Sequence, residues 1–134
     1  MTLAFLQKAE TNIKSARVLL GLGDTDGACS RAYYAMYDAA RAMLIWAGIA
    51  PERGAFRSHQ GLLSAFGLHL VKPGLFPTEP GRAIQRVQTL RQVADYEATP
   101  VPLEKALRAV GEAENFVTTA AALMATPYRK PSSP

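Results

Sequence analysis

The sequence predicts an all-α fold: an up-and-down bundle of four long helices plus one short helix, in a single domain over residues 1–126. Alanine is abundant and β-branched residues are sparse, and alanine loses no side-chain entropy on entering a helix. Apolar residues recur at three- and four-residue steps, which puts them on one helical face, and glycine or proline separates the segments. At 134 residues the chain suits one domain and can bury a core without a disulfide or metal.

The first two helices are expected over residues 3–20 and from Asp24 or Asp26 to Gly48. Either aspartate can cap the start of the second helix. The apolar face of the first helix comprises Leu6, Ala9, Ile13, Ala16 and Leu20. The second helix is apolar or aromatic nearly all round, which is typical of a helix that lies at the centre of a bundle or packs against a second subunit.

The remaining helices are less uniform. A short helix is expected over 58–70, followed by a loop at 72–77 that contains two prolines and a glycine. Longer helices are expected over 79–97 and 102–125, with Leu103, Leu107, Val110, Phe116, Val117 and Ala121 facing inward in the last. The C-terminal tail, residues 127–134, is expected to be disordered.

The net charge of +4 is concentrated in residues 51–91, which hold six basic and two acidic side chains. A local positive field attracts polyanions such as nucleic acids. The alternative is a solvated basic loop with no ligand.

Several classes of protein are not expected. The single cysteine, Cys29, excludes an internal disulfide, fits a cytoplasmic location and most simply fills the core. With two histidines and no paired-cysteine or glycine-rich phosphate motif, neither a metal nor a cofactor is expected. No apolar run reaches the roughly 20 residues that span a bilayer, so no membrane contact is expected.

Polar residues interrupt the second helix along one side. Arg31, Tyr34 and Asp38 share a face, because residues seven apart nearly superpose after two turns, and Tyr33 and Tyr37 lie on the adjacent face. One interpretation is an internal network in which Asp38 bonds Tyr34 and Arg41. The other is a cleft that grips phosphate through the guanidinium fork of Arg31.

Several segments resemble the HEPN family, in its subgroup of small stand-alone proteins. The most specific are Arg-Ala-Tyr-Tyr-Ala-Met at 31–36 and Arg-x-x-Ala-Asp-Tyr at 91–96, taken together at this separation. The resemblance also covers Phe5–Glu10, Asp26–Ser30, Ser58–Gly61, Phe66–Gly67 and Ala113–Phe116.

The resemblance implies a bundle of four or five helices that forms a homodimer through the motif helix. Many HEPN proteins are metal-independent ribonucleases, whose motif is an arginine followed after four to six residues by a histidine. Small members often accompany a minimal nucleotidyltransferase, the pair acting as toxin and antitoxin. Arg31 matches the motif arginine, whereas the histidine position is occupied by Asp38.

Asp38 departs from the family pattern, and three interpretations stay open. A carboxylate beside RNA phosphates is unfavourable, and it donates a proton poorly unless its pKa is raised. The chain has lost ribonuclease activity, or Asp38 works with a raised pKa, or His59 supplies the imidazole. The alternative role for His59 is to cap a helix or anchor a loop, and His69 is expected to be a partly buried helix residue.

The leading hypothesis is an RNA-directed, toxin-like protein: a metal-independent endoribonuclease with a nucleotidyltransferase antitoxin. The rival is a non-catalytic module that docks a nucleotidyltransferase or binds nucleotide or RNA. The candidate catalytic residues are Arg31, Asp38 and His59. The candidates for binding RNA or nucleotide are Tyr34, Arg53, Arg57, Arg82 and Arg86. Tyr33, Tyr37 and Asp95 are expected near the cleft or in structural roles, Asp95 through an ion pair with Arg91.

Overall fold

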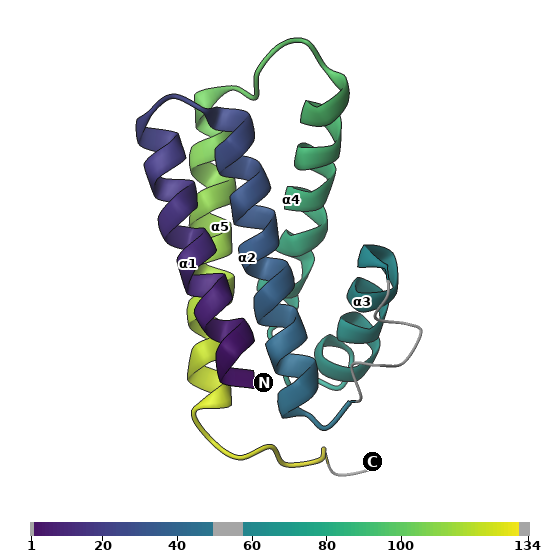
Figure 1. The fold of residues 1–134 in the computed structure, drawn as a ribbon. Coiled ribbons are helices and arrows are strands. Elements are labelled where there is room, and N and C mark those ends of the chain that lie inside the picture. Colours follow the sequence, from purple (N-terminus) through teal and green to yellow (C-terminus); the bar gives the residue numbers. More distant parts are fainter. Residues whose placement is uncertain (1, 50–57, 132–134) are drawn as a thin grey trace.

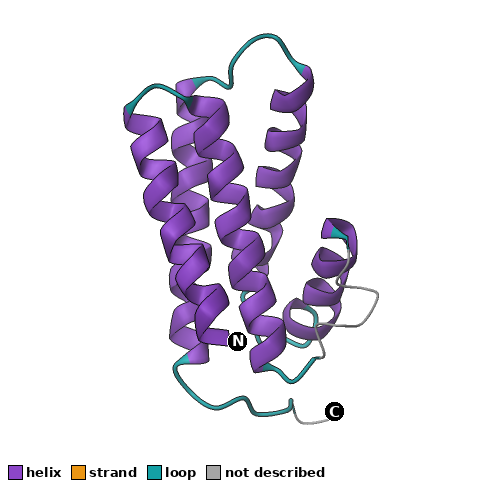
Figure 2. Cartoon of the chain, in the orientation of Figure 1, coloured by secondary structure: helices purple, strands orange, loops and turns teal. Residues whose placement is uncertain are grey.

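The computed structural model describes residues 2–49 and 58–131, and within these ranges all regular secondary structure is helical (Figures 1 and 2). The elements are α1 (Thr2–Gly21), α2 (Thr25–Trp46), α3 (His59–Phe66), the π-helix η2 (Gly67–Val71), α4 (Thr78–Tyr96) and α5 (Leu103–Met124). The predicted all-α fold of four long helices and a shorter one is confirmed.

Helix α2 is the central element of the bundle. It packs against α1, α3, α4 and α5, and its neighbours α1 and α4 flank it in Figure 1. Small residues such as Ala28, Ala32 and Ala35 are fully buried along it, so the neighbouring helices can approach closely. This position explains why α2 is apolar nearly all round.

Three phenylalanines form the large aromatic part of the core. Phe116 of α5 lies with its ring centroid 4.8 Å from that of Phe76 and 5.5 Å from that of Phe66. All three side chains are almost completely buried. This cluster attaches α3 and the segment after η2 to the main bundle.

The helix that begins at His59 changes its winding before it ends. The predicted helix over 58–70 is α-helical only to Phe66 and continues as the π-helix η2. The Lys72 N–H donates to the Gly67 carbonyl at 2.8 Å, the i→i+5 bond of a π-turn. The predicted loop then begins, and Gly74 turns the chain at a φ of 85°, which a side chain would disfavour.

The inward face of α5 differs from the prediction. Leu103 and Leu107 are 56% and 46% exposed, so their predicted inward placement is wrong. Val110, Phe116 and Val117 are buried as predicted, whereas near the start of α5 the buried residues are Ala106 and Ala109 in place of the two leucines. Alanine at these positions permits closer helix packing than leucine would. His69, expected to be partly buried, is exposed.

The start of the C-terminal tail contacts the end of α2. The indole N–H of Trp46 donates to the Thr126 carbonyl at 2.8 Å, and the Tyr128 ring packs edge-on against Trp46 at 5.1 Å. The disorder expected over residues 127–134 stays a prediction. Residues 132–134 of this segment lie outside the described part of the chain.

Among the described residues, no helix is both long enough and apolar enough to cross a bilayer.

Asp24 caps α2, and its removal tests how far the central helix depends on that cap. The Asp24 carboxylate accepts a hydrogen bond from the Gly27 N–H at 2.8 Å. We expect Asp24→Ala to lower the free energy of unfolding by about 1 kcal/mol, because this N–H loses its partner. Asp24→Asn keeps the acceptor and is the control in urea unfolding. Equal stability of Asp24→Ala and the parent would contradict the assignment.

Candidate functional site

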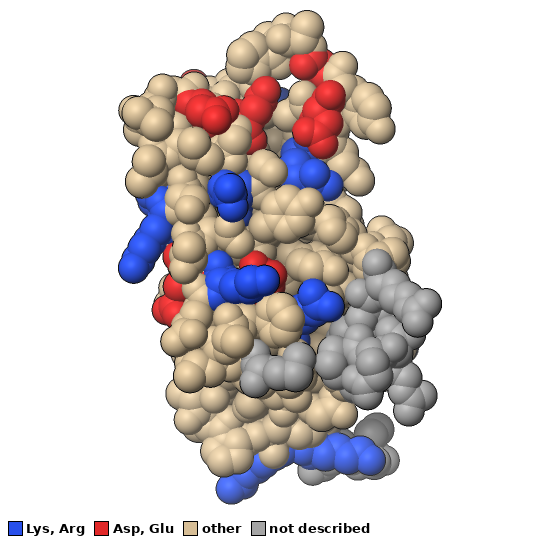
Figure 3. All heavy atoms as spheres, in the orientation of Figure 1, with Lys and Arg blue, Asp and Glu red and all other residues tan. Residues whose placement is uncertain are grey.

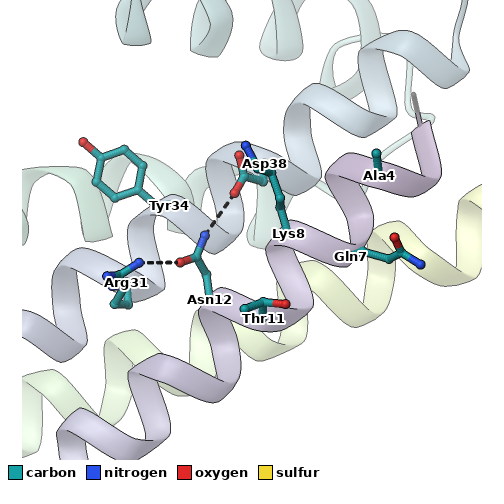
Figure 4. Close-up of a pocket in the computed structure, with 8 residues that line it drawn as sticks. All are labelled: Ala4, Gln7, Lys8, Thr11, Asn12, Arg31, Tyr34 and Asp38. Carbon is teal, nitrogen blue, oxygen red and sulfur yellow. Dashed lines mark hydrogen bonds between the residues drawn. The ribbon is translucent and has the colours of Figure 1, made fainter.

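A pocket of about 670 Å³ lies between α1 and α2. The residues that line it are mostly of polar or charged type and comprise Ala4, Gln7, Lys8, Thr11, Asn12, Arg31, Tyr34 and Asp38, which Figure 4 shows. We call it the α1–α2 pocket. Arg31, Tyr34 and Asp38 therefore share one side of α2, as their spacing predicts, and line a pocket.

The local sequence explains why polar groups gather at this helix pair. On α1 only Ala9 and Ala16 are fully buried, and these small side chains bring α1 close to α2. Lys8 and Asn12 are one turn apart on α1. The close approach of the two helices therefore sets them beside the polar side of α2.

Asn12 joins the two residues that the sequence singles out for chemistry. Its Nδ2 donates to Asp38 Oδ2 at 3.0 Å, and its Oδ1 accepts from Arg31 Nη1 at 3.2 Å (Figure 4). The hydrogen-bond network proposed from the sequence, Asp38 with Tyr34 and Arg41, is replaced in the structure by this contact from another helix.

The pKa of Asp38 is raised above its usual value. The main cause is burial, which disfavours the charged carboxylate. The hydrogen bond from Asn12 and the charges of Lys8 and Arg41 act in the opposite direction and limit the rise. Asp38 therefore holds a proton more readily than a solvent-exposed aspartate does.

Tyr33, Tyr34, Tyr37 and His59 form an aromatic cluster next to the pocket. The His59 ring lies 4.6 Å from that of Tyr37, and its Nδ1 is 3.2 Å from the Tyr33 hydroxyl oxygen. Burial, and secondarily the charge of Arg91, lowers the pKa of His59. His59 begins α3, so these contacts attach α3 to α2. His59 does not line the α1–α2 pocket, although its ring packs edge-on against Tyr34, which does.

Arg91 of α4 covers this cluster. Its guanidinium carbon lies 5.0 Å from the ring centre of Tyr33 and 5.6 Å from that of Tyr34, in cation–π geometry. Its Nη1 is 3.5 Å from Asp95 Oδ2, so the ion pair expected from the sequence is confirmed. On α2, Arg41 lies over the Phe5 ring at 4.8 Å. The sequence predicted neither aromatic contact.

The other basic candidates lie elsewhere or outside the described residues. Arg86 bonds Glu79 at 2.9 Å and Glu112 at 3.4 Å, which places it where α4 meets α5. Arg82 is exposed on α4, and neither arginine lines the α1–α2 pocket. Arg53 and Arg57 lie outside the described residues.

Positive charge near the pocket comes from three helices rather than from one basic segment. The contributing residues described above are Lys8, Arg31, Arg41 and Arg91. Figure 3 shows basic side chains at several levels along the face in view, and acidic ones both toward the end that carries the α1–α2 and α4–α5 turns and midway along the bundle. This distribution offers an anion more than one contact.

Two other kinds of chemistry find no support in the described residues. No group of three or more His, Cys, Asp or Glu side chains there could hold a metal ion. Cys29 is fully buried, and burial, followed by the charge of Asp26, raises the pKa of its thiol to about 11. It is therefore a core residue and not a reactive nucleophile.

A sequence model of the HEPN domain family matches residues 2–123, nearly the whole chain. The chain belongs to the HEPN domain family. The resemblance that its sequence motifs indicate is thereby confirmed.

Individual HEPN-related proteins are similar over most of the chain. One from Methanocaldococcus jannaschii, named "Putative toxin MJ0605", is 33% identical over 114 residues, which is 85% of this chain and 81% of the relative. One from Gloeobacter violaceus, named UPF0332 protein glr0978, is 35% identical over 68% of each chain. A second M. jannaschii protein, "Putative toxin MJ0142", is 31% identical over 70% of this chain and 60% of the relative.

Proposed function

We propose that this HEPN protein is a toxin-like, metal-independent endoribonuclease that acts at the α1–α2 pocket. The observation that carries the proposal is that Arg31 and Asp38 line one pocket and are joined through Asn12. The two relatives whose names include the word toxin support the toxin-like part.

Arg31 is assigned to hold the scissile phosphate. Its side chain is exposed, and its one hydrogen bond to a described residue is that from Nη1 to Asn12. A guanidinium has five N–H donors, so most of the fork stays free to bind phosphate oxygens. A fixed cation at this point also stabilises the charge that develops on the phosphate during cleavage.

Asp38 is assigned to carry protons. Attack by a ribose 2′-hydroxyl requires a base to take its proton, and the leaving oxygen requires a proton from an acid. Burial brings the pKa of Asp38 closer to neutral, where one group performs both steps more effectively. Lys8 lines the same pocket and offsets the carboxylate's repulsion of RNA. His59 is assigned an anchoring role, since its contacts are with the tyrosines of α2.

The remaining parts of the site serve binding. The Tyr34 ring is half-buried in the pocket lining, where an unstacked base can pack on it. Beyond its first turn, α2 leaves unburied a stripe at Ser30, Arg31, Tyr34, Asp38, Arg41, Ile45 and Trp46. A homodimer formed through α2 would use this stripe and bring two pockets together.

A nucleotidyltransferase antitoxin is the partner we propose for this toxin-like chain. Co-expression with a minimal nucleotidyltransferase tests the pairing. Co-purification and relief of growth arrest are the expected results.

A non-catalytic HEPN module is the second candidate, and one contact favours it. The hydrogen bond from Asn12 stabilises the ionised form of Asp38, so a smaller fraction of the molecules carries a proton there to donate to the leaving oxygen. In that case the pocket binds RNA or nucleotide through Arg31 and Tyr34 without cutting it.

Variants of Asp38 distinguish the two functions. With labelled RNA in EDTA, we expect the parent to cut and Asp38→Asn to cut about 10²- to 10⁴-fold more slowly while still binding, since only proton transfer is removed. Cleavage by the parent should fall as the pH drops through the raised pKa of Asp38. An inert parent with an active Asp38→His would favour the binding module. If neither the parent nor the variants cut RNA although all of them are folded, the proposed ribonuclease activity is rejected.

A further inference from the structure

Asn12 bridges two charged residues of the α1–α2 pocket. It comes from α1, whereas both of its partners, Arg31 and Asp38, come from α2. One side-chain amide uses its donor end for the carboxylate and its acceptor end for the guanidinium. Figure 4 shows the amide between the two groups.

The spacing on α2 separates the two charged groups that Asn12 contacts. Arg31 and Asp38 are seven residues apart, which is a rise of about 10.5 Å along the helix axis. Among the described residues, the structure has no ion pair between them. The gap is occupied by Asn12, which therefore fixes the position of each charged group relative to the other.

We propose that Asn12 is a positioning residue, which orients the Asp38 carboxylate and the Arg31 guanidinium relative to each other. The catalytic consequence rests on the proposed function, whereas the positioning is a property of the free protein. The inserted amide leaves the fork of Arg31 available to phosphate.

The amide is specifically required for this role. Aspartate at position 12 has the same shape and can accept from Arg31, but its ionised form cannot donate to Asp38. Alanine loses both contacts. The two substitutions therefore separate the contact with Asp38 from the contact with Arg31.

The charged and titratable groups around Asp38 define the expected change. Lys8 faces it from α1, and Arg41 and Tyr37 lie near it on α2. Arg91 of α4 lies over the neighbouring tyrosines. Among the interactions that favour the ionised carboxylate, the hydrogen bond from Asn12 is the largest. Its loss should therefore raise the pKa of Asp38 further.

The test titrates Asp38 in the free protein by NMR of ¹³C-labelled carboxyl groups, without RNA. We expect the pKa of Asp38 to rise in Asn12→Ala. It should rise more in Asn12→Asp, where a second carboxylate faces the first. Ser15→Ala, one turn further along α1 and outside the pocket, is the control and should leave the titration unchanged.

RNA cleavage by the same variants gives the second readout. We expect kcat to fall about ten- to a hundredfold in Asn12→Ala, as after loss of a hydrogen bond to a charged group. The acid limb of the pH–rate profile should move to higher pH by the same amount as the pKa of Asp38 measured by NMR. A structural role alone would lower stability without moving this profile.

The outcomes separate the two proposals. If Asp38 titrates alike in the parent, in Asn12→Ala and in Asn12→Asp, the positioning role is overturned. If its pKa rises as expected but no protein cuts RNA, positioning stands and the proposed ribonuclease function fails. If Asn12→Ala does not fold, Asn12→Asp, which keeps the side chain's shape, decides by the same titration.

Discussion

Replacing Arg31 with alanine is expected to lower the kcat for RNA cleavage by about 10²- to 10³-fold, because a fixed cation at the reacting phosphate is lost. Arg31 is exposed, so the free energy of unfolding should change by no more than about 0.5 kcal/mol. Binding of single-stranded RNA should also become less salt-dependent, by about 0.7 in the slope of log affinity against log salt for one lost phosphate contact. Single-turnover kinetics and a salt titration measure both effects.

Two matched variants define what Arg31 contributes. Arg31→Lys keeps the charge but loses the planar fork, so its rate should fall between those of the parent and Arg31→Ala. Arg108→Ala removes an exposed arginine of α5 that pairs with Glu112, away from the pocket, and should cut at the parent rate. Cleavage by Arg31→Ala at the parent rate would rule out a phosphate-binding role for Arg31.

Truncating Phe116 to alanine is expected to give the largest loss of stability, about 3–5 kcal/mol. Its side chain is completely buried and contacts the rings of Phe66 and Phe76. The substitution removes apolar contacts and leaves a cavity where α5 meets α3 and the segment after η2. Urea unfolding followed by circular dichroism measures the change.

Leu107 provides the control for this prediction, because it lies on the same helix and is 46% exposed. We expect Leu107→Ala to change the free energy of unfolding by no more than about 0.5 kcal/mol. The sequence-based prediction that Leu107 faces inward leads to the opposite expectation. A large decrease in the free energy of unfolding for Leu107→Ala, together with a small decrease for Phe116→Ala, would contradict the described packing.

Local pattern predicted the helices and the polar side of α2 well. Apolar spacing marks α1 and α2 within a few residues of their ends, because burial on one face repeats with the helical period. The same period places Arg31, Tyr34 and Asp38 on one side. These features depend only on residues within two or three turns of each other.

Features that depend on contacts between helices were not predictable in this way. Asn12 is one polar residue among several on α1, and nothing local marks it as the partner of Asp38, 26 positions away. The cation–π contact of Arg91 with Tyr33 likewise joins two helices distant in sequence. On α5, leucine and alanine both fit the periodic pattern, and the alanines Ala106 and Ala109 are the ones that are buried in the bundle.

The distribution of charged residues along the sequence showed an excess of basic residues but not the contacts that each of them makes. The excess of basic residues over 51–91 predicted either a surface that binds nucleic acid or a solvated basic loop. Arg86, however, is engaged by Glu79 and Glu112, and the pocket draws its cations Lys8 and Arg31 from the first third of the chain. Linear charge counts do not reveal which cations already have acidic partners.

NMR mapping of RNA on the ¹⁵N-labelled protein tests the central claim most directly. The RNA is a short single strand with 2′-O-methyl groups, which block cleavage, and the buffer contains EDTA. The account predicts that the largest shifts fall on residues of the α1–α2 pocket, including Asn12, Arg31, Tyr34 and Asp38. Shifts centred instead on Arg82 and Arg86, or no shift at saturating RNA, would contradict it.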